Sequence, residues 1–262
     1  MLPSKRAPMR HFLPRLLRPA TAPLLLALLL AASAAWGQKT PTTEPHFAGG
    51  PDSLRALLGR VQQQASPALR GQLFLKLSLN KDGQPTKSTY LTPATVADRQ
   101  LTRNKEAQAA AQSLLGQLPP WQLDPTASPD SKVATTVVLP LTFGPMAGPV
   151  PLLYSEQKPV FPLPTDERAP RDSSPYLVFL QRQFRYPPDD LRNRVQGTAY
   201  GYFEVSEAGA VEQRRVVGSL SPTIDAELLR VLQTLPNATA PPRHQGRPVR
   251  VAYLVPINLH IM

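Results

Sequence analysis

Two segments of the chain alternate between apolar and polar positions with period two, the pattern of a half-buried β-strand. Each segment starts at a glycine and meets a second glycine twelve residues later: Gly71 and Gly83, then Gly197 and Gly209. The side chains predicted to face inward are Leu73, Leu75, Leu77 and Leu79 in one segment, and Ala199, Gly201, Phe203 and Val205 in the other. Because glycine tolerates positive φ, Gly83 and Gly209 predict tight turns into returning strands.

Helical periodicity follows the second hairpin. Ser221 and Pro222 are the residue types of an N-cap and a first helical position, and Asp225 lies in the first turn, where the helix dipole favours a carboxylate. The apolar residues at helical spacing are Ile224, Leu228, Val231, Leu232 and Leu235. The sequence therefore predicts an amphipathic helix here.

The first hairpin is followed by a similar pattern. Asp98 is the predicted N-cap of an alanine-rich helix that runs through Leu114 and Leu118. Helices are also predicted ahead of the two hairpins, over 53–64 and 176–186. The order of elements is thus the same in both segments, which indicates a tandem repeat.

Each repeat closes with an apolar stretch that contains one proline. These stretches are 133–143 with Pro140, and 249–261 with Pro256. A proline cannot donate a hydrogen bond to a neighbouring strand. We therefore predict that each proline lies on an edge strand or at a strand end.

A proline-rich stretch separates the repeats. Eight of the 32 residues over 144–175 are proline, a composition that favours the extended polyproline conformation over helix or sheet. The predicted organisation is a short spacer over 38–46, a first domain over 47–143, this linker, and a second domain over 176–262.

The N-terminus has the three parts of a secretory signal peptide. Residues 1–37 hold five basic and no acidic residues. Within them a basic stretch is followed by a 13-residue apolar run, and Ala35 and Gly37 are small residues at its end. We predict cleavage between Gly37 and Gln38, which places the mature protein in the periplasm or cell envelope.

An uncleaved membrane anchor is the alternative. The uncharged run over 19–38 has 20 residues, and a spanning helix needs about 20. The protein would then cross the inner membrane once, with its domains in the periplasm. A membrane contact is expected only in this case.

Charge and composition narrow the range of functions. The net charge of +11 falls to +6 without residues 1–37, too little to predict a nucleic-acid partner, although it favours acidic ones. The chain has no cysteine, which excludes disulfides, thiol nucleophiles and iron–sulfur clusters.

No catalytic or metal-binding motif stands out. His46, His244 and His260 have no second ligand at metal spacing, and the first two lie among prolines, which predicts solvated loops. No nucleophile-elbow, phosphate-loop or dinucleotide glycine pattern occurs. We therefore expect no enzyme, no cofactor and no metal.

Several motifs of the second repeat agree in order and spacing with one family. They are Tyr186-Pro187, Gly197-x-Ala-x-Gly-x-Phe-x-Val205, Gly209-x-Val211, Val216 with Ser219, Asp225-x-x-Leu228, Gly246-Arg-Pro-Val249 and Val255-Pro256-Ile257. With these residues the second repeat resembles the TonB C-terminal domain family of bacterial envelope proteins. The first repeat is a weaker match that keeps Gly71, Gly83 and Leu118-Pro119.

This resemblance implies an α+β fold of two tandem small domains, each a three-stranded antiparallel sheet with packed helices. In the family, the domain binds an extended segment of an outer-membrane transporter alongside its last strand, by strand addition to an open edge. By analogy the docking edge here is Val249–Leu259. The partner-binding residues would be Val249, Val251, Tyr253, Val255 and Ile257.

Two other surfaces are candidates for binding. Four arginines near the sheet could line a basic face for an acidic partner, or belong to a solvated sheet face: Arg214, Arg215, Arg247 and Arg250. Tyr200 and Tyr202 lie on the strand face opposite Phe203. They form a binding platform if that face is exposed, and part of a core if a helix covers it.

Three hypotheses follow. The first is a non-enzymatic exported protein of the Gram-negative envelope that binds a partner protein by strand addition, in a TonB-related transport or envelope role. It is favoured because the apolar run over 19–38 holds no ionisable residue that could engage a motor. The second is an inner-membrane-anchored energy transducer for outer-membrane transporters. The third is an enzyme or glycan-binding module that uses Tyr200 and Arg214.

Overall fold

A computed structural model of the protein describes residues 45–123, 135–144, 150–164 and 174–261. All of them belong to one compact unit, Pro41–Met262. The elements of the first half are β1 (His46–Phe47), α1 (Gly50–Gln64), β2 (Gly71–Leu79), β3 (Pro85–Tyr90), α2 (Val96–Arg103), α3 (Lys105–Leu115), β4 (Trp121–Gln122) and β5 (Thr135–Phe143). Those of the second half are α4 (Pro175–Gln183), α5 (Pro188–Arg192), β6 (Gly197–Val205), β7 (Val211–Gly218), α6 (Pro222–Gln233), β8 (Arg243–His244), β9 (Arg247–Pro248) and β10 (Val251–Leu259).

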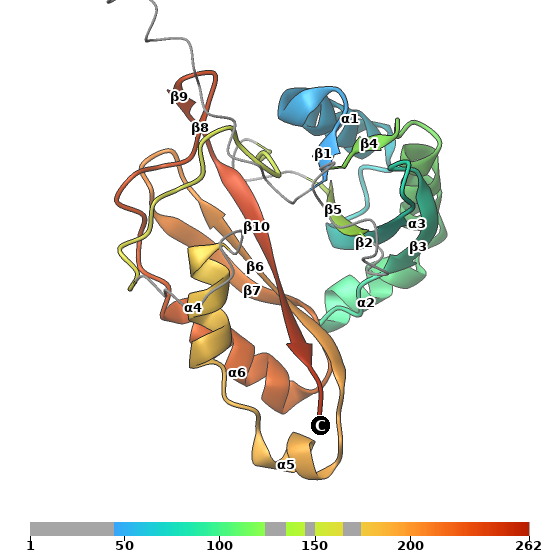
Figure 1. Cartoon of the computed structure of the whole chain (residues 1–262). Coiled ribbons are helices and arrows are strands. Elements are labelled where there is room, and N and C mark those ends of the chain that lie inside the picture. Colours follow the sequence, from blue (N-terminus) through green and yellow to red (C-terminus); the bar gives the residue numbers. More distant parts are fainter. Residues whose placement is uncertain (1–44, 124–134, 145–149, 165–173, 262) are drawn as a thin grey trace, which may run out of the picture. The chain divides into compact units, whose positions relative to one another are not determined.

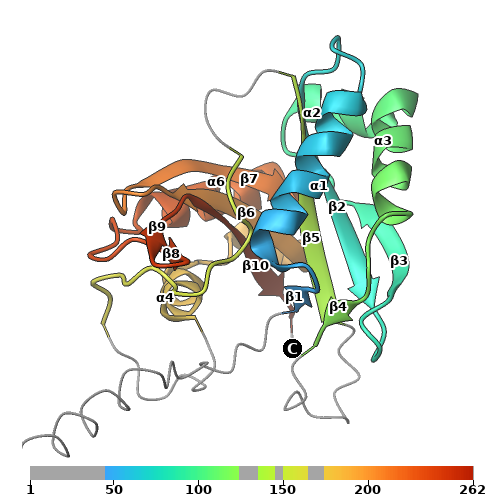
Figure 2. The ribbon, with the colours of Figure 1, turned by 90° about the horizontal axis from the view of Figure 1, so that it is seen from above.

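The first half is a three-stranded antiparallel sheet in the order β3-β2-β5, with helices on one face (Figure 2). The four leucines of β2 predicted to face inward are buried, and they pack with Leu54 of α1, Leu101 of α2 and Leu114 of α3. Period-two burial on the strand and helical burial on α1 to α3 thus build one core.

The second half repeats this arrangement in the order β10-β6-β7, with α4 and α6 on one face of the sheet (Figure 1). Phe203 of β6 and Leu228 of α6 are fully buried in its core. A Cβ on Gly201 would lie 3.0 Å from Leu232 Cδ1, so α6 packs directly on the strand backbone at that point.

The α+β class, the three-stranded sheets and the edge position of both prolines are confirmed. Pro140 and Pro256 lie inside β5 and β10, which are edge strands. Ser221 caps α6, since its hydroxyl accepts the Ile224 N–H at 3.1 Å. The domain boundaries stay a prediction.

Asp98 is not the N-cap predicted for the first half. Thr95 is the N-cap of α2, and its hydroxyl accepts the Asp98 N–H at 3.2 Å. The single alanine-rich helix is also divided, because the Asn104 side chain accepts the N–H groups of Glu106 and Ala107 and so begins α3.

Part of the predicted linker is attached to the second half. Over 150–164, which we call the strap, three non-proline residues form bridges: Leu152 with Val251, Gln157 with Arg243, and Val160 with Ala240. These residues keep their backbone N–H, and each donates it to the second half at 2.9–3.0 Å. Proline content alone predicted an extended linker and did not indicate that its non-proline residues pair with the second half.

Tyr200 and Tyr202 are core residues. They form one buried cluster with Phe74 and Leu91 of the first half, and the Phe74 and Tyr202 rings meet edge to face at 5.8 Å. The cover is therefore a strand face of the first half, where the sequence suggested a helix. The binding-platform alternative is wrong.

Candidate functional site

The outer edge of β10 is the predicted docking site. β10 pairs with β6 on one side. The Ala252 N–H donates to the Leu152 carbonyl at 2.8 Å, so it points away from β6. Because backbone groups alternate sides along a strand, those of Leu254, Pro256 and Asn258 also point outward.

The predicted partner-binding residues therefore need a correction of one position. Val249 precedes β10, and Val251, Tyr253, Val255 and Ile257 turn their backbone groups toward β6. The side chains of Val251 and Val255 are fully buried, and Tyr253 stacks on Phe203 at 5.2 Å. A guest strand would meet the intervening residues instead.

The strap occupies the start of this edge. Leu152 donates its N–H to the Arg250 carbonyl at 2.9 Å and accepts the Ala252 N–H, and its side chain is 1% exposed. A guest strand can therefore reach only Leu254–Leu259. Within that stretch Pro256 has no N–H, so the outward donors are those of Leu254 and Asn258.

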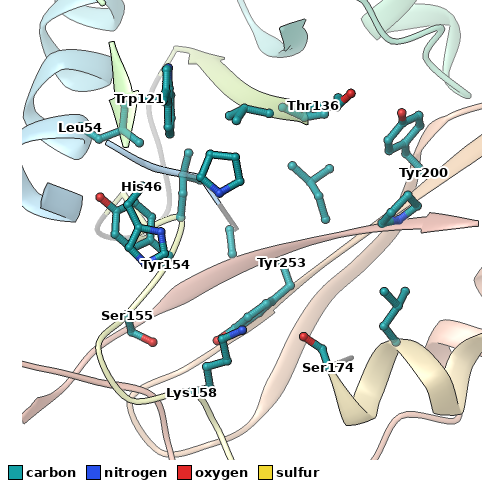
Figure 3. A pocket seen from close by; sticks show the side chains of 18 of the residues that line it. His46, Leu54, Trp121, Thr136, Tyr154, Ser155, Lys158, Ser174, Tyr200 and Tyr253 are labelled. Carbon is teal, nitrogen blue, oxygen red and sulfur yellow. The ribbon is translucent and has the colours of Figure 1, made fainter. Parts of the chain in front are cut away.

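A cavity of about 320 Å³ lies beside this open stretch (Figure 3). Strand β10 contributes Ala252, Tyr253, Leu254 and Pro256 to its wall, and β5 contributes Thr136, Val137 and Val138. The aromatic side chains around it are those of His46, Trp121, Tyr154, Tyr176, Tyr200 and Tyr253. No sequence motif predicted this cavity, because its walls come from segments far apart in the chain.

One wall of the cavity is held by aromatic contacts. The His46 ring stacks on Tyr154 at 5.0 Å, and the Tyr154 hydroxyl donates to the Phe47 carbonyl at 3.3 Å. Burial raises the pKa of Tyr154 to about 12, so its phenol is neutral at physiological pH. The wall offers polar tips on a largely apolar surface.

The four arginines do not form one basic face. Arg214 donates to the Leu232 and Leu235 carbonyls at 3.1 Å, at the end of α6, and burial lowers the pKa of its guanidinium. Arg215 lies over the Tyr202 ring at 4.4 Å and donates to Gln72 of the first half. The basic-face prediction is wrong for these two, because their charges are used within the fold.

Arg250 is surrounded by acids. Its guanidinium lies 2.7 Å from Glu212, 3.1 Å from Glu204 and 3.8 Å from Glu207. The hydrogen bond with Glu212 raises the pKa of Arg250 further. Of the four arginines, Arg247 in β9 is exposed. These four arginines therefore do not concentrate positive charge on one surface for an acidic partner.

Two histidines differ from their predicted loops. His46 lies in β1, and the His244 side chain in β8 is 10% exposed, with Nε2 3.0 Å from an Asp52 carboxylate oxygen and Nδ1 3.4 Å from Glu156. Local proline content did not indicate these contacts, because they join segments that are distant in the sequence. Among the described residues, no group of three His, Asp or Glu side chains has the geometry of a metal site.

The predicted cleavage site, Gly37 and Gln38, lies outside the described residues, as does the apolar run over 19–38. Within the described ranges, no helix has the length and apolar character needed to cross a membrane.

Comparison with known proteins gives a family match for the second half of the chain and none for the first. Residues 182–261 match the family model described as the Gram-negative bacterial TonB protein C-terminal. This match confirms the resemblance found in the sequence, and it includes β6, β7, α6 and β10. Neither the curated proteins nor the solved structures contain a match to this chain.

Proposed function

We propose, from the premise that residues 182–261 form a TonB C-terminal domain, that this protein is an exported, non-enzymatic component of the Gram-negative envelope. TonB C-terminal domains act through protein interaction, in general with outer-membrane transporters. The partner we propose is an extended segment of such a transporter or of another envelope protein. The segment is bound by strand addition at the free part of the β10 edge.

The observation that carries the proposal is the open edge itself. From Leu254 to Leu259 the outer side of β10 pairs with no strand of the described residues, while its inner side is fully paired with β6. An unpaired edge offers N–H and C=O groups in the spacing that a second strand requires. Pairing with a guest strand cannot extend to Ala252, because the Leu152 carbonyl of the strap already accepts the Ala252 N–H.

In-cell photocrosslinking tests this proposal. A photoreactive amino acid replaces Asn258, whose side chain is exposed on the free edge, and a matched variant carries it at Arg192, which is 71% exposed on α5. We expect an adduct from position 258 alone, and peptide sequencing should map it to one short segment of an outer-membrane transporter. Equal adducts from both positions, or none from position 258, would contradict strand addition at this edge.

Deleting 249–262 is a poorer test, because Val255 and Ile257 belong to the core and the second half would unfold. The intact mass of the protein from an envelope fraction separates the exported binder from the anchored transducer. A chain that starts near Gln38 supports the former, and one that retains the apolar run over 19–38 supports the latter.

A further inference from the structure

The cavity beside β10 is bordered by two strand edges. We propose that it is a slot for one extended, apolar peptide segment, which lies between the outer edge of β10 and the outer edge of β5. The inference rests on the proposed function, because the segment is part of the same partner. It adds that the first half contributes half of the binding site.

The direction of the β5 backbone follows from its neighbours. The Leu91 N–H donates to the Phe74 carbonyl at 3.0 Å, so Phe74 turns its backbone groups toward the β3 side. Its neighbour Leu75 must then face β5, where it pairs with Leu139. By alternation the backbone groups of Val138 point away from the sheet, as those of Leu254 do on β10.

Both outward-facing residues line the same cavity. Val138 and Leu254 are among its wall residues, and neither has a hydrogen-bond partner on its outward side within the described part of the chain. Each is followed two residues later by a proline, Pro140 or Pro256. Val138 and Leu254 therefore each offer an N–H donor at the cavity, two residues before a proline that has none.

These features define the occupant. Two rows of backbone groups are satisfied by another backbone in extended conformation, and not by a helix, whose own groups are already paired. The wall is mostly aromatic and aliphatic, although Ser155, Lys158 and Ser174 also line it. An apolar side chain matches most of this surface, and a charged one would be desolvated against it. We expect a short apolar stretch in the bound segment.

Hydrogen exchange of the unaltered full chain gives the first test. The probe is a synthetic peptide selected on the full chain from a phage library of random 12-residue sequences. We expect the peptide to slow exchange at both the Val138 and the Leu254 amides. Slowing at Leu254 alone would overturn the two-edge slot and leave the proposed function standing.

Proline substitutions give the second test. Val138→Pro and Leu254→Pro each remove one outward donor without touching the ladder to the neighbouring strand, and each should weaken peptide binding roughly three- to tenfold. Thr142→Pro is the control on β5, since Thr142 also faces outward but lies outside the cavity. It also loses the hydrogen bond that the Thr142 hydroxyl accepts from Gln72 at 2.7 Å, so melting curves of all three variants check folding.

The outcomes separate the two proposals. Loss in both variants supports the slot. Loss in Leu254→Pro alone limits binding to β10 and overturns the slot. Unchanged binding in both variants, or a library that yields no binding sequence, overturns the proposed function as well.

Discussion

The two sheets have the same strand order and the same proline, yet their edges differ. Pro140 pairs with Phe74 and Pro256 with Tyr200, and each partner is the fourth residue of its central strand. The strap pairs with the outer side of β10, whereas no strand of the described residues pairs with the outer side of β5. The two halves thus share a strand topology, but their sheet edges are covered differently, and the strands that can bind a guest segment depend on that covering.

The helices diverge in a similar way. In the second half one helix, α6, follows the hairpin, whereas the first half has α2 and α3 with Asn104 between them. Both arrangements bury leucines against the central strand. Burial of the same face therefore tolerates a broken helix, provided that the new helix start is capped.

Truncation of the central strands should have the largest effect. Phe203→Ala and Leu77→Ala change equivalent positions, six residues after Gly197 and Gly71, and both side chains are fully buried. We expect losses of about 3–5 kcal/mol for the phenylalanine and about 2–4 kcal/mol for the leucine. Urea denaturation followed by circular dichroism measures both. A loss below about 1 kcal/mol in either variant would show that this core tolerates the cavity.

Releasing the strap should have an intermediate effect that is confined to one sheet. Leu152→Ala removes a side chain that is 1% exposed, and we expect a loss of about 2 kcal/mol together with faster exchange of the Ala252 amide. Exchange on β5 should not change. Leu153→Ala, a half-buried neighbour, is the control. An unchanged Ala252 amide would show that the strap does not depend on Leu152.

The helix caps should have the smallest effect. Asn104→Ala and Ser221→Ala each remove a side chain that accepts backbone N–H groups, and each should cost about 1 kcal/mol. Asn104 accepts two such groups and Ser221 one, so the asparagine should cost at least as much. Arg192→Ala, which breaks an exposed ion pair, is the reference at less than about 0.5 kcal/mol. A cost at Asn104 no greater than this reference would mean that packing alone starts α3.

Local pattern was enough to predict most of the fold. The alternation along β2 and β6 and the glycines of the two turns are properties of neighbouring residues, and they give the strands and hairpins. A Cβ on Gly83 would lie 1.9 Å from the Trp121 carbonyl oxygen, so the glycine at this turn is required by packing as well as by its φ of 75°. The division at Asn104 was missed, although asparagine favours caps and turns over helix interiors.

The candidate site depends on contacts between distant residues, which no local pattern reveals. The bridge from Leu152 to β10 spans about a hundred residues of sequence, and the adjacent pair Leu152 and Leu153 within a proline-rich stretch was its one available signal. The predicted basic face of arginines was wrong because packing determines where each side chain points and which partners it contacts. The docking residues were shifted by one position because periodicity gives two faces of a strand without saying which backbone groups are already paired.

The two prolines also bear on self-association. A sheet with an open edge can pair with the edge of another copy, and such pairing can continue from molecule to molecule. Pro140 and Pro256 each interrupt the row of donors that a second copy would need. The chain can therefore keep two edges accessible to a short guest segment and still resist growth into a continuous intermolecular sheet.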